Sequence, residues 1–417
     1  MKIALINRND VYGGAARATL RLHNELLEQG VESVLVADKV HGNVKNIVGK
    51  SNISSKISQR TRDYLNEIPL RIGGYKYSSP FSPNFIGINI FKKKQVYHSD
   101  IIHLNWINGG FININDLILL KQPIVWTLHD VWPFTGGCHI LGKCSKYING
   151  CGKCPQLNSN KNMDISYKLV NKKNNILKNL NITFIAPSKW MAERIKESFL
   201  FSEIQGKVQI IPNGIDTKVY KPINSFKAKE ELGLDKNKKV ILFGAVNATS
   251  DRNKGYLLLK DALKFLYETS SNFERENIQL VVFGSDNKVE ENMGFKTINI
   301  GKINDEKKLT LLYSAAEVMC VPSIQESFGQ TALESIACGT PVVSFKTSGL
   351  LDIIDHKING FTAKSYDVRE FARGIQWLLR EDMDRSKISS LAREKALNKF
   401  DIRNTTKQHI HLYEDLL

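Results

Sequence analysis

Short apolar runs alternate with helix-like patterns along most of this 417-residue chain, and this alternation limits the fold more than any other feature. Strand–helix–strand repeats of this kind form parallel sheets with helices on both faces. Several runs are apolar throughout, as in strands that are covered on both sides. The expected strands of a first sheet are residues 3–6, 34–37, 101–104, 124–128 and 183–186, and those of a second sheet are residues 208–211, 240–244, 280–284, 318–321 and 341–345. We therefore predict an α/β fold with two doubly wound, Rossmann-like domains.

The domain boundary is expected between residues 186 and 221, where Pro187, the turn at 212–216 and Pro222 interrupt regular structure. This predicts an N-terminal domain at 1–200 and a second domain at 201–390. We expect the C-terminal helices, 391–417, to pack back toward the N-terminal domain.

Two stretches show no strand pattern. After Phe371 the patterns are helical, at 371–379, 388–397 and 406–416. Residues 41–95 are rich in Ser, Asn and Lys, and we expect an irregular segment there that faces an acceptor.

The formal net charge is +16, which favours anionic partners. Nucleic acid is not expected, because the lysines are scattered without interleaved aromatic residues or arginine clusters. An anionic membrane surface fits better, and a solvated lysine-rich surface is an equal alternative. No run approaches the ~18 apolar residues of a membrane span, and residues 1–10 show no signal-peptide pattern. We expect a cytoplasmic protein, and peripheral contact with the inner face of the plasma membrane stays open.

The segment 322–334 is the strongest candidate site. It follows an expected strand, and a helix is expected to begin near Gln330. A helix amino terminus at the carboxyl end of a parallel strand attracts phosphate through its free N–H groups and its dipole. Gly329 allows close approach of the backbone, and Glu326 and Glu334 offer acceptors for sugar hydroxyls. Taken alone, two such glutamates are more often a solvated helix face.

The same segment resembles the retaining glycosyltransferases of family 4, almost residue for residue. This resemblance implies the GT-B fold, with two Rossmann-like domains that face an interdomain cleft. It also implies that Glu326 contacts the transferred sugar and that Phe328 and Gly329 line the sugar-diphosphate site. Gln330 and Thr331 would approach the phosphates, and Glu334 would bind the nucleotide ribose.

Three further matches lie outside this segment. Gly13 and Gly14 follow the first expected strand and resemble the family's amino-terminal glycine loop, although a Gly-Gly pair alone is a weak signal. The run 126–130 ends with the pair His129 and Asp130, and in the family this histidine points to the donor sugar. Asn213 lies in the turn 211–216, which also reads as an ordinary Asn-Gly turn.

A cationic clamp for the donor diphosphate is expected after the strand that ends at Gly244. By the resemblance, Lys254 is the cation. Many family members carry an arginine directly after this glycine, where this chain has Ala245. Arg252 is a candidate replacement from the loop. Gly284 is expected to open the pocket for the base.

The resemblance implies catalysis by Glu326, His129 and Lys254, with retention of configuration and without a metal or other cofactor. We expect transfer of a hexose from a UDP- or GDP-sugar to a growing surface polysaccharide or lipid-linked oligosaccharide. The alternatives are a GT-B nucleotide-sugar 2-epimerase and a non-catalytic basic protein at the membrane surface. A nicotinamide-dependent oxidoreductase is disfavoured, because the first turn lacks Gly-x-Gly-x-x-Gly.

Four cysteines lie within 17 residues: Cys138, Cys144, Cys151 and Cys154. The Cys151-x-x-Cys154 half has the spacing of a zinc knuckle, whereas Cys138 and Cys144 are wider apart. A structural zinc ion, reduced thiols and disulfides are all left open. The cluster resembles a subset of family 4 proteins associated with exopolysaccharide assembly, including those for colanic acid.

Overall fold

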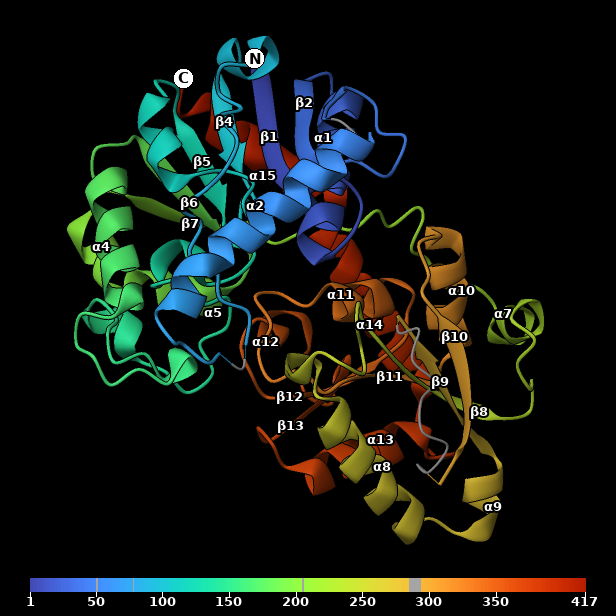
Figure 1. Cartoon of the computed structure of the whole chain (residues 1–417). Coiled ribbons are helices and arrows are strands. Elements are labelled where there is room, and N and C mark those ends of the chain that lie inside the picture. The colour runs from blue at the N-terminus through green and yellow to red at the C-terminus, as the bar shows by residue number, and fades with distance from the viewer. Residues whose placement is uncertain (50–51, 78, 205, 285–293) are drawn as a thin grey trace. The chain divides into compact units, whose positions relative to one another are not determined.

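The computed structural model describes all residues except 50–51, 78, 205 and 285–293. The chain divides into two compact units (Figure 1). Unit 1 comprises Met1–Pro212 and Thr405–Leu417, and unit 2 comprises Asn213–Asn404. The C-terminal segment thus returns to the first unit.

Unit 1 is built on a seven-stranded sheet of order β3-β2-β1-β4-β5-β6-β7, in which neighbouring strands are parallel. The strands are β1 (Lys2–Asn9), β2 (Glu32–Lys39), β3 (Ile47–Val48), β4 (Ile101–Leu104), β5 (Ile124–Thr127), β6 (Ile182–Ala186) and β7 (Lys207–Ile210). The helices are α1 (Gly14–Glu28), α2 (Ile53–Ile72), α3 (Lys94–Tyr97), α4 (Ile165–Leu177), α5 (Lys189–Lys196), α6 (Phe199–Glu203) and α15 (Ile402–Glu414), with short 3-10 turns η1 (Ile114–Leu119), η2 (Trp132–Phe134), η3 (Lys146–Asn149) and η4 (Pro155–Leu157).

Unit 2 repeats the plan with a six-stranded parallel sheet of order β10-β9-β8-β11-β12-β13. Its strands are β8 (Lys239–Gly244), β9 (Ile278–Phe283), β10 (Lys296–Gly301), β11 (Val318–Val321), β12 (Val342–Phe345) and β13 (Gly360–Ala363). Its helices are α7 (Ser225–Glu231), η5 (Arg252–Lys254), α8 (Tyr256–Thr269), α9 (Asn272–Glu276), α10 (Glu306–Ala315), α11 (Gln330–Ala337), α12 (Leu350–Ile353), α13 (Val368–Leu379) and α14 (Arg385–Phe400). Both sheets have the strand order of a doubly wound fold.

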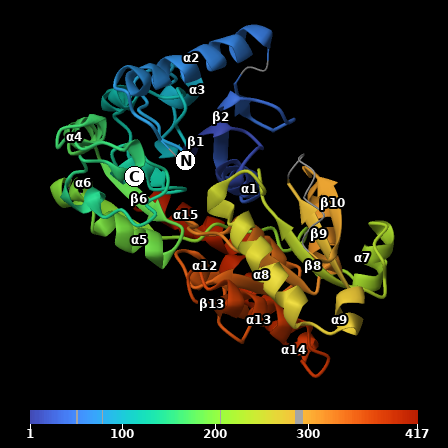
Figure 2. The ribbon, with the colours of Figure 1, turned by 60° about the horizontal axis from the view of Figure 1, so that its bottom comes forward.

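Each sheet is covered on both faces, as the apolar runs predicted. In β8, Val240 and Leu242 pack on one side with α10, α11 and α14, whereas Ile241 and Phe243 pack on the other with α8 and α13. Figure 2 shows α8 and α13 next to each other on that second face. In unit 1, Leu412 and Tyr413 of α15 join α1 over the first sheet. Side chains alternate across a strand, so a run that is apolar throughout serves two cores.

Residues 208–211 were predicted in the second sheet, and this is wrong. β7 pairs in parallel with β6 at the edge of the first sheet. The connection through α5 and α6 is short, and consecutive strands with such a crossover generally share a sheet. Three of the described strands were not predicted: β3 has only two residues, β10 is an edge strand with partly exposed residues, and β13 is only the tetrapeptide Gly-Phe-Thr-Ala.

The prediction that 41–95 is irregular is also wrong in part, because α2 spans 20 residues. Its buried face consists of Gln59, Arg62, Asn66 and Leu70. Arg62 donates to the carbonyl of Gly110 and pairs with Asp38 at 2.6 Å. A helix that docks mainly through polar side chains shows no apolar period in the sequence. Among the residues that the structure describes, no helix is long and apolar enough to span a bilayer.

Candidate functional site

Strand order reverses between β8 and β11 in unit 2. The chain leaves both strands at the same edge of the sheet, and ligands of open α/β sheets bind at this kind of switch point. The loop after β8 carries η5, and the loop after β11 leads to α11. Of the residues predicted to bind the donor, these two loops contain Arg252, Lys254, Phe328 and Gly329, and α11 begins with Gln330 and Thr331.

The two loops are locked together by backbone and amide hydrogen bonds around Asn253. Its carbonyl accepts from the N–H of Ile324 at 2.9 Å. Its side chain accepts from the N–H of Gln325 at 3.2 Å and donates to the carbonyl of Gln325 at 2.7 Å. On the other side, the N–H of Glu326 donates to Ser348 Oγ at 2.8 Å. The Glu326 backbone is therefore held from both sides.

These hydrogen bonds bring Lys254 and Glu326 together. Lys254 Nζ donates to Glu326 Oε1 at 2.7 Å, and the two side chains are 24% and 17% exposed. Burial on its own lowers the pKa of Lys254, but the charge and hydrogen bond of Glu326 outweigh it and raise this pKa overall. The lysine thus remains a cation at neutral pH.

Gly329 forms the N-cap of α11 with φ +115°. A Cβ at this position would lie 2.6 Å from Leu350 Cδ2, the end of a side chain that can move, so glycine is favoured mainly by the left-handed conformation. Gln330 and Thr331 begin the helix and are partly exposed. The first N–H groups of α11 therefore lie at the carboxyl edge of the sheet, as expected for an anion site.

Two predicted donor residues have buried side chains. The Phe328 ring is 2% exposed and packs edge-on against Phe400 at 5.5 Å. Glu334 is 1% exposed, and its carboxylate accepts from the Tyr313 hydroxyl at 2.9 Å. The Phe328 ring is therefore packed inside unit 2, and the ribose role of Glu334 stays a prediction.

The glycines after β8 and β9 allow the strands and loops to pack closely. A Cβ on Gly244 would lie 2.3 Å from the Phe283 ring, and one on Gly284, at φ +85°, would lie 2.0 Å from the Ala245 carbonyl oxygen. The Arg252 side chain is exposed next to Lys254 in η5. It extends toward solvent instead of joining the ion pair.

The remaining predicted residues lie elsewhere. Asn213 is the first residue of unit 2 and is partly buried. Gly13 caps α1 with φ +99°, and Gly14 is the first residue of that helix. His129 follows β5, with Nε2 at 2.9 Å from Asn105 Oδ1. Burial lowers the pKa of His129 to about 4, so the imidazole is neutral at pH 7.

A hydrogen-bonded chain that the sequence analysis missed lies at the carboxyl edge of the first sheet. Asp130 Oδ2 lies 2.6 Å from His139 Nδ1, and His139 Nε2 lies 2.8 Å from Ser82 Oγ. Trp106 Nε1 also donates to Asp130 at 2.7 Å, and its ring lies 5.6 Å from that of His139. A partly exposed indole next to hydrogen-bonding groups suits a sugar ring. The signal in the sequence that could have indicated this hydrogen-bonded chain is the position of His139, directly after Cys138 of the cysteine cluster.

The four clustered cysteines line one small cavity in unit 1, of about 20 Å³. All six cysteines of the chain are free thiols. Burial raises the pKa of Cys138 to about 12 and also raises the pKa of Cys151 and Cys154. Such thiols are poor nucleophiles. Within the described ranges, no group of three or more His, Cys, Asp or Glu side chains already stands in a metal-binding arrangement.

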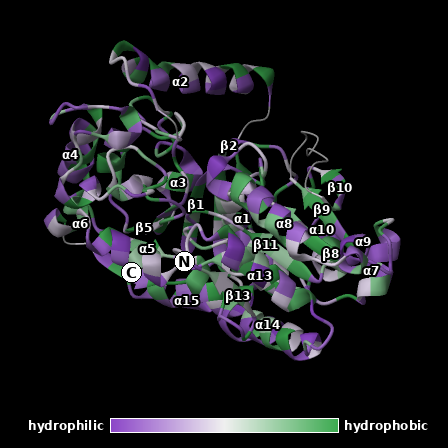
Figure 3. Cartoon of the chain, turned by 90° about the horizontal axis from the view of Figure 1, so that it is seen from below, coloured by the Kyte–Doolittle hydropathy of each residue, from purple (hydrophilic) through white to green (hydrophobic). Residues whose placement is uncertain are grey.

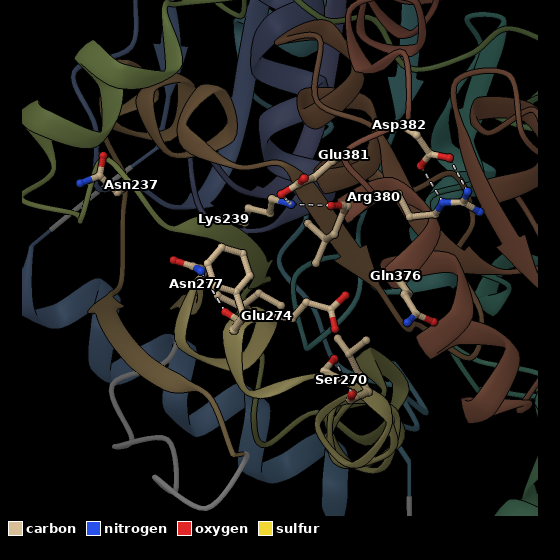
Figure 4. Close-up of a pocket in the computed structure, with 13 residues that line it drawn as sticks. Asn237, Lys239, Ser270, Glu274, Asn277, Gln376, Arg380, Glu381 and Asp382 are labelled. Atoms are coloured by element: carbon tan, nitrogen blue, oxygen red, sulfur yellow. Dashed lines mark hydrogen bonds and ion pairs between the residues drawn. The ribbon is translucent and has the colours of Figure 1, made fainter.

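A larger pocket, of about 620 Å³, lies at the opposite end of β8 and β9, where these strands begin (Figure 4). Lys239 donates to the Leu379 carbonyl at 2.8 Å, and Arg380 donates to Asp382 at 2.8 Å. These cations are committed to protein acceptors and compete poorly for a phosphate. None of the residues predicted to bind the donor lines this pocket.

Family models match the two halves of the chain. Glycosyltransferase Family 4 matches residues 12–219, and Glycosyl transferases group 1 matches residues 224–395. The putative colanic acid biosynthesis glycosyl transferase WcaC of Escherichia coli is 25% identical over 390 residues, which cover 89% of this chain and 90% of WcaC.

Solved structures share the fold over the full chain. Sucrose-phosphate synthase from Thermosynechococcus elongatus has a TM-score of 0.70 at 20% identity and covers 100% of this chain and 98% of its own. Anabaena HepE in complex with UDP and glucose has a TM-score of 0.66 at 17% identity, with 100% of both chains covered. The two Rossmann-like sheets are thus those of a GT-B fold.

Proposed function

Since the chain belongs to the family 4 glycosyltransferases, we propose that it is a retaining hexosyltransferase that uses a UDP- or GDP-sugar. The acceptor is a growing surface polysaccharide or a lipid-linked oligosaccharide. The observation that carries this proposal is the Lys254–Glu326 pair at the β8/β11 switch point, next to the amino terminus of α11. The putative role of WcaC in colanic acid biosynthesis supports the polysaccharide acceptor, and the UDP in the HepE complex supports a UDP-sugar as the first donor to test.

The donor diphosphate binds the amino terminus of α11, where Gly329, Gln330 and Thr331 supply backbone and side-chain donors. Lys254 neutralises the phosphate charge. An ammonium group has three donors, so Lys254 can hold Glu326 and a phosphate oxygen together. Glu326, oriented in this way, accepts hydrogen bonds from the hydroxyls of the transferred sugar.

The transfer breaks the bond between the anomeric carbon and the diphosphate oxygen and forms a bond to the acceptor oxygen on the same face. The acceptor proton passes to a phosphate oxygen of the leaving nucleotide. Lys254 and the α11 N–H groups stabilise the charge that develops on this leaving group. These fixed groups serve in place of a metal ion. His129 of unit 1 is neutral at pH 7, so it can form hydrogen bonds without adding a positive charge.

The acceptor side is proposed for unit 1, at Trp106, His139 and Ser82. The indole of Trp106 supplies an apolar face, and the Asp130–His139–Ser82 chain supplies oriented hydrogen-bonding groups. Asp130 holds His139 Nδ1 and so fixes the orientation of the imidazole ring. His139 Nε2 in turn orients the Ser82 hydroxyl, which can form a hydrogen bond with an acceptor hydroxyl. In this proposal these residues position the acceptor, and no further residue is needed to remove the acceptor proton.

Peripheral membrane contact is proposed for the outward face of α2. Ile53, Ile57 and Tyr64 are 76%, 60% and 55% exposed, and Arg60 lies on the same stripe. Figure 3 shows green and purple stretches side by side on this helix. Exposed apolar residues mixed with cations favour the surface of an anionic bilayer. Co-sedimentation with vesicles that contain anionic lipid tests it, since Ile57→Glu should weaken binding while uncharged vesicles bind little.

The experiment for the function is incubation of purified protein with separate UDP- and GDP-sugars and detection of released nucleotide. Glu326→Ala and Lys254→Ala should lose most of the activity. Full transfer by Glu326→Ala would contradict the site, and failure of every donor to bind would contradict the function. Interconversion of the free sugar nucleotide without transfer would favour the 2-epimerase alternative.

A further inference from the structure

Two loops of unit 1, between η2 and η3 and between η3 and η4, bring four thiols to one place. Cys138 follows the turn η2, Cys144 precedes η3, and Cys151 and Cys154 lie between η3 and η4. All four line the same small cavity. Cys138, Cys151 and Cys154 are also close enough for their charges to interact with one another and with Cys144. The wider spacing of the first pair in the sequence is therefore no obstacle to a shared site.

Backbone N–H groups point to three of these sulfur atoms. The N–H of Lys146 lies 3.4 Å from Cys144 Sγ. The N–H groups of Gln156 and Leu157 interact with the Cys154 sulfur, and that of Gly136 interacts with the Cys151 sulfur. Cys144 and Cys154 thus share one local geometry, in which the second residue after the cysteine donates to its sulfur. Donors of this kind stabilise a thiolate more than a thiol.

The backbone between the last two cysteines is folded tightly. Gly150, Cys151, Gly152 and Lys153 have φ values of 81°, 63°, 83° and 40°. Left-handed backbone is unfavourable for the two residues that are not glycine, and it persists where the surroundings demand it, which is common at ligand sites. Here it keeps Cys151 and Cys154 on the lining of one cavity.

We propose that Cys138, Cys144, Cys151 and Cys154 bind one divalent metal ion of the zinc type as four thiolates. A cavity of about 20 Å³ exceeds the ~10–15 Å³ that a single water needs, so it has room for one ion. The sulfur atoms are not yet at ligand positions, and rotation of the cysteine side chains toward the cavity closes the site. Binding releases the thiol protons to solvent, so affinity rises with pH.

Such a site is structural, because four protein ligands fill the tetrahedral coordination of zinc and leave no position for substrate. Its effect on the reaction is indirect. The same segment carries Asp130 and His139, and His139 is the residue that follows Cys138 in the chain. The ion would therefore fix the loop that positions the proposed acceptor residues.

The first experiment uses the full-length protein, purified and kept under reducing conditions. The protein is depleted with a chelator, reloaded with Zn²⁺ or Co²⁺, and separated from free metal. We expect about one ion per chain and, with Co²⁺, the strong absorption of thiolate-to-cobalt charge transfer. Absence of bound metal together with absence of this absorption would overturn the proposal.

Cys144→Ser and Cys151→Ser should each weaken Zn²⁺ binding at least ~10-fold. Cys320→Ala is the matched control, since this thiol is buried in unit 2 away from the cluster, and it should bind as the unaltered chain does. Equal binding by all variants would refute the assignment.

Alkylation of the unaltered chain provides a readout that does not depend on the folding of any variant. Zn²⁺ should protect the four cluster thiols, as counted by mass spectrometry. Equal labelling with and without Zn²⁺, or disulfides among these cysteines in the reduced preparation, would likewise overturn the proposal.

Discussion

Removal of the Lys254 ammonium group tests the proposed donor site most directly. In Lys254→Ala the interlock of the two loops should persist, because three hydrogen bonds of Asn253 hold residues 324 and 325 independently of the lysine. What is lost is the cation. The variant therefore separates charge from loop position.

The expected magnitudes follow from burial. Lys254 and Glu326 are 24% and 17% exposed, so their pair lies between a surface ion pair, worth up to ~1 kcal/mol, and a buried one, whose disruption costs ~3–5 kcal/mol. We expect a stability loss of about 1–2 kcal/mol. Loss of a fixed group that stabilises developing charge costs about 2.7–4 kcal/mol, or ~10²–10³-fold in rate. Activity should thus fall far more than stability.

The assay is nucleotide release at varied donor concentration, with stability followed by urea denaturation. Lys254→Arg should recover part of the rate, because it restores the charge with a different shape. Lys264→Ala, on the exposed side of α8, is the matched control and should leave the rate unchanged. A kcat/KM for Lys254→Ala within threefold of the unaltered enzyme would refute the role of Lys254 as the phosphate cation.

Three further predictions concern the loop, the helix start and the acid side of the stability profile. Arg252→Ala should weaken donor binding by only ~3–10-fold, measured by titration with UDP, and the difference should vanish at high salt because this side chain is exposed. Gly329→Ala should lower stability by about 1–3 kcal/mol and reduce nucleotide release, since alanine is strained at the φ of +115° that this position adopts; an unchanged thermal midpoint would contradict this. Burial lowers the pKa of His409 to about 4, below the ~6.5 of the unfolded chain, so stability should fall as pH drops from 6.5 to 4. The loss from this one histidine is up to ~3 kcal/mol, and His409→Asn should flatten the profile measured by urea denaturation.

The sheets were largely predictable because a parallel strand buried on both faces must be apolar along its length. Val318–Val321 and the run at 240–244 are of this kind. The sequence of β7 also predicted a strand, but its four residues contain no information on which sheet the strand joins. That choice depends on pairing with β6, which is a tertiary contact.

The helix α2, in contrast, could not be predicted from an apolar pattern. Its docking side consists of Gln59, Arg62 and Asn66, whose partners are the carbonyl of Asp38, the carbonyl of Gly110 and the backbone of Ile86. These partners lie 20 to 48 positions away in the chain. Hydrogen bonds with distant backbone groups leave no periodic trace in the sequence.

The candidate site combines both situations. Lys254 and Glu326 are 72 positions apart, and only the order of β8 and β11 in the sheet makes them neighbours. Ser82 and His139 are 57 positions apart, and no motif joined them beforehand. The loop that holds Glu326 and the helix start at Gly329 could be located from a single segment, because strand, turn and helix follow one another directly there.

The side chains of the 322–334 segment differ in burial: some are exposed enough to contact a ligand, and others are packed inside unit 2. Glu326 keeps a partly exposed carboxylate, whereas Phe328 and Glu334 are packed inside unit 2. The two glutamates therefore need not be equivalent, even though both belong to the same motif. A side chain that is 1% exposed reaches a ribose only if the helix start shifts or the rotamer changes, while the α11 N–H groups need no such change to bind phosphate. The diphosphate contacts proposed for α11 thus require less rearrangement than the ribose contact proposed for Glu334.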